Sequence, residues 1–116
     1  MADRFEDERG VIQDILGPID CVTRIFTVRG GVRGNHVHKH TTQWTYVLYG
    51  KLLVVTEQNG IRLERAYKPG DLCCEEPGTA HAWKALEDTA VLVFARGPRA
   101  GEHYESDTFR EGIKLL

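Results

Sequence analysis

The chain lacks any long apolar segment and any strong excess of charge of one sign. Its longest apolar run covers residues 90–95, far fewer than the about 20 residues that a membrane-spanning helix needs, and its first residues lack the apolar core of a signal peptide. The formal net charge is −2, from 15 basic and 17 acidic residues, so no positive field would attract nucleic acid. We therefore expect a cytoplasmic protein that binds neither nucleic acid nor a membrane.

Cysteine is also scarce, with three residues in the chain and no Cys-x-x-Cys spacing. Two of them, Cys73 and Cys74, are neighbours, and in an extended strand their side chains point to opposite faces. We expect small buried or half-buried thiols and no disulfide framework, in keeping with a reducing compartment.

Helical periodicity is missing from the middle of the chain, which disfavours a doubly wound α/β fold. Short alternating or β-branched runs stand there instead, separated by turn sequences such as Asn59-Gly60, whose residues accept the positive φ of a tight hairpin. The strands are expected at residues 21–29, 43–49, 51–57, 61–67, 72–75, 81–86 and 90–96. These 116 residues suffice for one domain. We predict a single all-β domain over residues 1–116 with an antiparallel barrel at about 21–96 and terminal extensions that pack on the barrel or on a second subunit.

Three histidines in two remote segments stand out. His36 and His38 are one residue apart in a segment of extended character, so their rings should project from the same face. His81 follows a similar turn sequence much further along the chain. The two segments could close on one site that grips a metal ion or a polar ligand.

The spacing around these histidines carries a family resemblance. The first segment has the pattern G-x5-H-x-H-x4-Q-x6-G and the second has G-x7-G-x2-H, formed by Gly30, His36, His38, Gln43, Gly50, Gly70, Gly78 and His81. Together they resemble the two motifs of the cupin superfamily. That resemblance implies a double-stranded β-helix, also described as a jelly-roll barrel, and a homodimer.

Two positions depart from the cupin pattern. Gln43 stands where the family usually has a carboxylate, and Glu76-Pro77 places the second-motif proline one position later than usual. A site made of His36, His38, Gln43 and His81 would therefore hold a divalent ion with a neutral amide oxygen in place of a charged ligand. Imidazole nitrogen and amide oxygen suit manganese, iron, nickel or zinc, and the sequence does not choose among them.

A narrower resemblance lies within the cupins. The stretches Glu8–Gly10, Arg24–Val28, Arg33–Lys39 with Gln43, and Tyr104–Arg110 look like those of the sugar-nucleotide 3,4-ketoisomerases and, more distantly, the deoxysugar 3,5-epimerases. That likeness implies proton transfer beside a ketone without a metal, with His36 and His38 as the catalytic histidines. In that group a glutamine at the position of Gln43 is ordinary.

The residue types are compatible with this chemistry. Histidine titrates near neutral pH and can move a proton to and from carbon beside a carbonyl. Arg33 could hold a phosphate in a bidentate contact, with Lys39 as a nearby point charge. Tyr46 and Trp83 are candidates for contact with a sugar-derived substrate, although aromatic residues in such strands are often simple packing residues.

Several functions remain open from sequence alone. The main hypothesis is a metal-binding cupin enzyme of the isomerase or epimerase type that acts on a small carbohydrate-derived carbonyl compound. The alternatives are a metal-free sugar-nucleotide 3,4-ketoisomerase or epimerase, a cupin dioxygenase, and a non-catalytic sugar-binding module.

Overall fold

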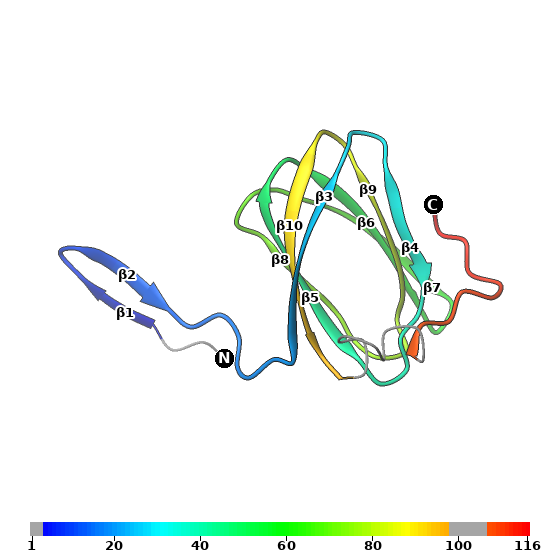
Figure 1. Cartoon of the computed structure of the whole chain (residues 1–116), viewed down its shortest axis with the longest axis horizontal. Helices are drawn as coiled ribbons and strands as arrows, with labels where there is room; N and C mark the ends of the chain where they lie inside the picture. Colours follow the sequence, from blue (N-terminus) through cyan, green and yellow to red (C-terminus); the bar gives the residue numbers. More distant parts are fainter. Residues whose placement is uncertain (1–3, 98–106) are drawn as a thin grey trace.

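The protein is built from antiparallel β-strands. The computed structural model describes residues 4–97 and 107–116, and these residues form ten strands in three sheets (Figure 1). A small sheet pairs β1 (Arg4–Asp7) with β2 (Gly10–Gln13). No helix in the described residues is long and apolar enough to span a bilayer.

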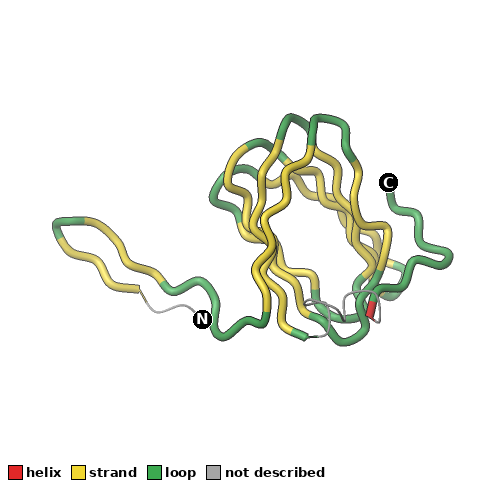
Figure 2. Tube along the Cα trace, in the orientation of Figure 1, coloured by secondary structure: helices red, strands yellow, loops and turns green. Residues whose placement is uncertain are grey.

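Two four-stranded sheets face each other and form the barrel (Figure 2). The first sheet has the order β3 (Cys21–Thr27), β10 (Thr89–Arg96), β5 (Thr42–Tyr49) and β8 (Leu72–Glu75). The second has the order β4 (Val32–His36), β9 (Ala80–Ala85), β6 (Leu52–Gln58) and β7 (Ile61–Tyr67). This all-β architecture of two antiparallel sheets agrees with the predicted jelly-roll barrel.

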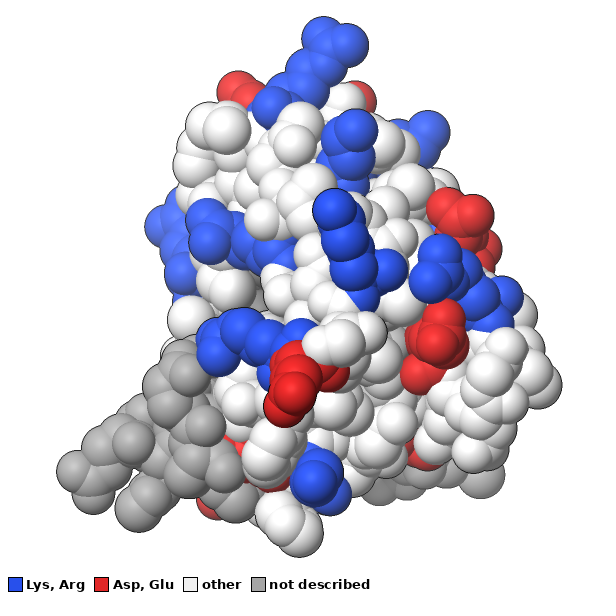
Figure 3. Space-filling model, turned by 90° about the vertical axis from the view of Figure 1, so that its right-hand side faces the viewer, with Lys and Arg blue, Asp and Glu red and all other residues white. Residues whose placement is uncertain are grey.

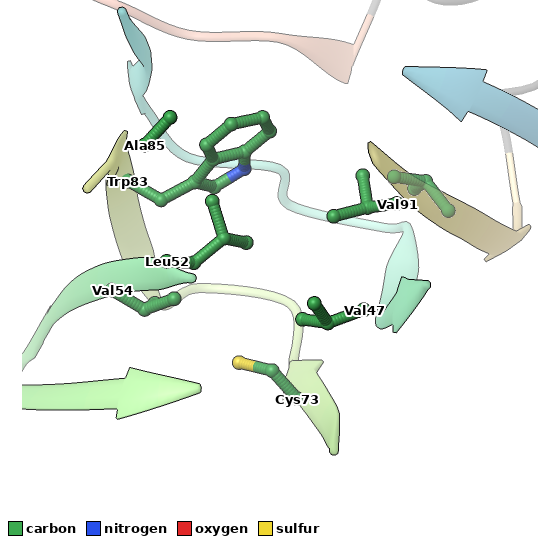
Figure 4. Close-up of a cluster of buried hydrophobic side chains, with 8 residues drawn as sticks. Val47, Leu52, Val54, Cys73, Trp83, Ala85 and Val91 are labelled. Carbon is green, nitrogen blue, oxygen red and sulfur yellow. The ribbon is translucent and has the colours of Figure 1, made fainter. Parts of the chain in front are cut away.

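Alternation along each strand explains why the two sheets enclose a core. In β5, Gln43, Thr45 and Val47 are buried while the residues between them are partly exposed, as expected when one face of a strand looks inward. One half of the interior is apolar and is made by Val47, Leu52, Val54, Cys73, Trp83, Ala85, Val91 and Val93 (Figure 4). All three cysteines are free thiols. Cys73 is buried and Cys21 half-buried as expected, but Cys74 is exposed, because its side chain points to the opposite face of β8 from that of Cys73.

The seven strands expected from the sequence are present, with ends within two residues of the expected ones. The hairpin turn between β6 and β7 is also as expected, since Asn59 and Gly60 have φ of 53° and 75°. Three further strands, β1, β2 and β4, were not expected. β4 lies in the segment around His36 whose extended character was expected, but its bounds were not, because it contains Gly34 and Asn35, which are poor strand formers.

The two terminal segments differ in whether they contact the barrel. The β1–β2 hairpin projects away from the barrel (Figures 1 and 2). The C-terminal segment instead lies against the second sheet, where Leu115 packs on Val55 and Ala82. Asn35 holds that segment, because its side-chain oxygen accepts the backbone N–H of Leu115 at 2.7 Å.

Candidate functional site

The three histidines meet inside the barrel. His36 is the last residue of β4, His38 lies two residues further on, and His81 is in β9. Their exposed fractions are 9%, 2% and 2%, and the distances between ring centroids are 4.6–5.3 Å. One ligand nitrogen of each ring lies within 4.8 Å of those of the other two. The expected convergence of two remote segments is therefore present in the structure.

The local backbone that brings His36 and His38 together is not a regular strand. Gly34 and Asn35 have positive φ, and the register between β4 and β9 shifts between Gly34 and His36. A Cβ on Gly34 would lie 2.8 Å from the carbonyl oxygen of His81, so only glycine allows the two strands to approach this closely. His38 lies beyond the end of β4, so strand alternation alone does not explain why both rings face inward.

The C-terminal segment fixes His38. The Nδ1 of His38 lies 2.9 Å from the carbonyl oxygen of Asp107, and because a carbonyl oxygen only accepts, Nδ1 must carry the hydrogen. The lone pair of the neutral ring then belongs to Nε2. His81 repeats this arrangement with its Nδ1 at 3.3 Å from the carbonyl oxygen of Thr79. Both rings thus offer Nε2 for proton transfer or metal binding.

The Asp107 carboxylate supports the loop that follows His38. It accepts the backbone N–H groups of Lys39 and His40 at 3.1–3.2 Å. Burial raises the pKa of this carboxyl, but the hydrogen bonds from the 39–41 loop outweigh burial and hold the pKa below its usual value. Asp107 is 1% exposed and therefore acts as a buried anchor between the C-terminal segment and the histidine loop.

A cavity of about 290 Å³ opens beside the histidines. It is lined by Ile25, Val32, Arg33, Gly34, His36, Gln43, His81, Trp83, Val93 and Arg110. Gln43, Arg33 and Trp83 thus lie where the sequence analysis expected functional side chains. The Arg33 guanidinium also donates to the Thr27 hydroxyl at 2.9 Å, so it links β4 to β3 at the rim of the barrel.

Three of the expected site residues do not line this cavity. His38 lies beside His36 but is not part of the wall. Lys39 is exposed, with its ammonium 4.4 Å from the centroid of the Phe109 ring. Tyr46 corrects our expectation of substrate contact, because it alternates with the buried Thr45 and Val47 and so faces the outside of the barrel.

Sequence reasoning missed two neighbours of the site, Arg110 and Glu75. Arg110 belongs to the 104–110 stretch that carried the family resemblance, but nothing in the spacing indicated that it would line the cavity. Glu75 is 1% exposed and lies opposite Gln43 in the pairing of β5 with β8. Burial raises its pKa to about 8, and the Cys73 thiol donates to it at 3.5 Å. An acidic residue at an inward position of an alternating strand was the available signal.

The donor set fits a divalent metal ion. Three imidazole nitrogens close together suit zinc and the borderline transition metals, and the Gln43 amide in the same cavity could add an oxygen. The bonds from Nδ1 of His38 and His81 to carbonyl oxygens are the outer contacts that orient metal-binding histidines. The three-histidine cluster can therefore hold a metal.

The chain is therefore a small antiparallel β-barrel protein in which histidines from two remote segments face an internal site. The cupin domain family matches residues 25–95, and the chain belongs to the cupin family. Among curated proteins, an oxalate decarboxylase from Arthroderma benhamiae is 32% identical over 88 residues, which are 73% of this chain. The match covers 20% of the length of that protein.

Solved structures with the same fold include sugar-nucleotide enzymes. The sugar 3,4-ketoisomerase QdtA from Thermoanaerobacterium thermosaccharolyticum, in complex with TDP, superposes with a TM-score of 0.75 at 19% identity and covers 96% of this chain and 85% of its own. A 3,4-ketoisomerase from Helicobacter canadensis gives 0.74 at 17% identity, covering 95% and 86%. A dTDP-4-dehydrorhamnose 3,5-epimerase from Sulfolobus tokodaii gives 0.65 at 20% identity, covering 90% and 70%.

Proposed function

We propose that the protein is an isomerase or epimerase of the sugar-nucleotide 3,4-ketoisomerase and 3,5-epimerase kind, with histidine as the acid and base. The observation that carries this proposal is the buried cluster of His36, His38 and His81 beside a cavity of about 290 Å³. Imidazoles in such a site can take a proton from carbon beside a ketone and return it at a neighbouring atom.

His36 is the base in this proposal because it lines the cavity, whereas His38 lies behind it with ring centroids 4.7 Å apart. For a 4-keto sugar, His36 takes the hydrogen of C3 as a proton. The electron pair of the broken C3–H bond forms a double bond between C3 and C4, and the π pair of the C4 carbonyl moves to O4, which gives an enediolate. The proton then returns to C4 and the O3 hydroxyl proton moves to O4, which leaves the ketone at C3. His38, whose Nδ1 is bound to the carbonyl oxygen of Asp107, packs beside the His36 ring and limits its movement.

The charge of the site supports an anionic substrate. Arg33 and Arg110 both line the cavity, and Lys and Arg side chains are spread over the face of the molecule that carries β4 and the C-terminal segment (Figure 3). A diphosphate-linked sugar carries the matching charge. Similar structures were solved with TDP and with TDP-4-keto-6-deoxyglucose, so these are the first compounds to test.

The test uses TDP-4-keto-6-deoxyglucose in deuterated water, followed by NMR and mass spectrometry. We expect deuterium at C3 or C4 for a ketoisomerase and at C3 and C5 for an epimerase. His36→Asn should lower the rate by about 10²–10⁴. His40→Asn is the matched control, because His40 is exposed in the neighbouring loop, and it should keep the wild-type rate.

Tight binding of TDP without any exchange of substrate hydrogens would instead indicate a non-catalytic sugar-binding module. Equal rates for wild type and His36→Asn would contradict the proposed base.

The second candidate function is a metal-dependent cupin enzyme that acts on a small carbohydrate-derived carbonyl compound. The specific observation in its favour is that one nitrogen from each of three imidazoles lies within 4.8 Å of the others. His36, His38, His81 and Gln43 would hold the ion, and a bound divalent metal would supply Lewis-acid polarisation of a carbonyl, or oxygen chemistry if it were redox-active.

Elemental analysis of protein purified without an affinity tag separates the two candidates. The metal-dependent reading predicts one ion per chain, lost in the His36→Ala/His38→Ala double variant. It also predicts tighter binding in Gln43→Glu, since a carboxylate adds charge to the ligand set. Isomerisation at full rate after chelation, with metal below a tenth of an ion per chain, would favour the metal-free reading, and oxygen consumption would indicate a dioxygenase.

A further inference from the structure

A second cavity, of about 320 Å³, opens on the edge of the second sheet that lies away from the histidines. It is formed by β6 and β7 and is lined by Val54, Thr56, Leu63, Glu64, Arg65 and Tyr67. None of these residues lines the histidine cavity, which opens beside β4. β4 and β7 are the two edges of that sheet, so three strand spacings of about 4.8 Å separate them. The two cavities are therefore distinct.

This second cavity is present because β8 covers the inward side of β7 only in part. Directly opposed residues of an antiparallel pair lie on the same side of a sheet, and Val54, which points into the core (Figure 4), is paired with Arg65. Arg65, and Leu63 two residues before it, therefore lie on the inward side of β7. β8 is the edge strand of the first sheet and has four residues against seven in β7. Leu63 is left 65% exposed.

Tyr67 forms the inner end of the second cavity, where it packs against the apolar core. Burial and a hydrogen bond with the Cys73 thiol raise the pKa of Tyr67 to about 12, so its hydroxyl stays neutral near pH 7. The Arg65 guanidinium lies over the Tyr67 ring, with its central carbon 5.0 Å from the ring centroid. This cation–π contact orients the guanidinium and leaves its N–H donors available to a ligand.

Arg65 gives the second cavity a positive charge. Within residues 4–97 and 107–116 it forms no hydrogen bond or ion pair. The Asp71 carboxylate interacts with Arg65 electrostatically but is itself paired with Lys68, at 3.3 Å. Glu64 lines the rim, yet it alternates with Arg65 and so lies on the outer side of the sheet. The inward side of the cavity therefore combines one cation with the apolar side chains of Leu63 and Val54.

We propose that the second cavity binds a small carboxylate that has an apolar or aromatic body. The carboxylate pairs with Arg65, because a guanidinium matches a carboxylate through two parallel hydrogen bonds. The apolar body lies on Leu63 and Val54. The volume of the cavity is at the lower end of the range for small-molecule sites, so the ligand has about the size of a substituted benzene ring. This binding does not depend on the chemistry at the histidines.

NMR of the isotope-labelled full chain, titrated with sodium benzoate at constant ionic strength, tests this proposal. We expect saturable shifts of the backbone amides of Thr56, Leu63 and Arg65, with a dissociation constant of about 1 mM or below. Sodium acetate lacks the ring and benzyl alcohol lacks the charge. Each should bind at least about threefold more weakly than benzoate, since each keeps only one part of the recognition.

Substitutions on β7 separate the two parts of the recognition. Arg65→Gln removes the cation and should weaken benzoate binding at least about threefold. Leu63→Ser removes the apolar contact and should weaken the binding of benzoate but not of acetate. The matched control is Arg62→Gln, because Arg62 is on the same strand but on its other side, where it pairs with Glu57, and it should leave the dissociation constant unchanged. All three positions are exposed, so the variants should fold.

The location of the shifts distinguishes this cavity from the histidine cavity. His36→Asn should bind benzoate at β7 as the wild type does. Shifts confined to the amides of His36, Gln43 and their neighbours would overturn the proposal, as would equal weakening by Arg65→Gln and Arg62→Gln. Acetate binding as tight as that of benzoate would also overturn it, and so would the absence of a saturable shift up to about 50 mM benzoate.

Discussion

Asp107 links two parts of the chain that are distant in sequence. Its backbone carbonyl fixes the ring of His38 and its carboxylate accepts two backbone N–H groups of the following loop. Histidine chemistry in this site therefore depends on a residue outside the histidine motifs. This contact is also what makes the C-terminal segment part of the site.

Asp107→Asn tests this anchor. We expect a loss of about 1–3 kcal/mol in the free energy of unfolding at pH 7, because a buried charged acceptor is replaced by a neutral amide. Since the folded-state pKa of Asp107 is lowered, the carboxylate's contribution is present above its unfolded pKa near 3.8 and is lost as pH falls through the folded value. Urea unfolding at pH 7 and pH 3 should show the variant and wild type converging in acid; a constant difference would contradict this account.

Glu75 has the opposite pH dependence. Burial raises its folded-state pKa to about 8 from the ordinary 4.5, so the folded chain keeps a proton that the unfolded chain releases. Between these two pH values wild-type stability should fall as pH rises, at no more than about 1.4 kcal/mol per pH unit. Glu75→Gln removes this titration, so its stability relative to wild type should increase between pH 5 and pH 8 by a few kcal/mol. Parallel stability profiles for the two proteins would show that Glu75 does not titrate in this range.

At the scale of elements, the site depends on how closely β4 approaches β9. Gly34 has a φ of +94°, and a Cβ there would lie 2.8 Å from one backbone atom of β9 and 3.0 Å from another. The register of the pairing between β4 and β9 shifts between Gly34 and His36, and this shift places His36 opposite His81. The glycine is thus required by strand packing as well as by backbone conformation.

Gly34→Ala and Gly60→Ala separate these two effects. Gly60 also has a positive φ, of +75°, but a Cβ there meets nothing within 4 Å, so its substitution should cost about 1 kcal/mol from conformation alone. Gly34→Ala should cost at least about 2 kcal/mol more and should also weaken ligand or metal binding at the histidines. Thermal unfolding and binding assays on both variants check this; equal costs would mean that β4 can move away from β9 without penalty.

At the scale of the whole molecule, the chain end is tied to the barrel by Asn35. The Asn35 side chain accepts the N–H groups of Leu115 and Leu116 and donates to the carbonyl oxygen of Leu116, and its φ is 56°. Asn35→Gly keeps this conformation and loses the three hydrogen bonds, whereas Asn35→Ala also adds about 1–2 kcal/mol of backbone strain.

Hydrogen exchange should therefore show faster exchange at the Leu115 and Leu116 amides in both variants, with the alanine variant globally less stable than the glycine variant. Unchanged protection of these amides would mean that packing of Leu115 on Val55 and Ala82, rather than Asn35, holds the tail.

The sequence by itself determined seven of the ten strands in the described residues, because alternation of inward and outward side chains and the Asn59-Gly60 turn are local properties of the chain. It also determined that His36, His38 and His81 belong to one site, because motif spacing sets where the two segments meet in a barrel. Only the tertiary structure decided how they meet. Four features depend on contacts between segments far apart in sequence: the register shift at Gly34, the Asp107 contact to His38, the burial of Glu75 opposite Gln43 and the outward direction of Tyr46. The pattern of a single strand carries no information about which neighbouring strand will lie across from it.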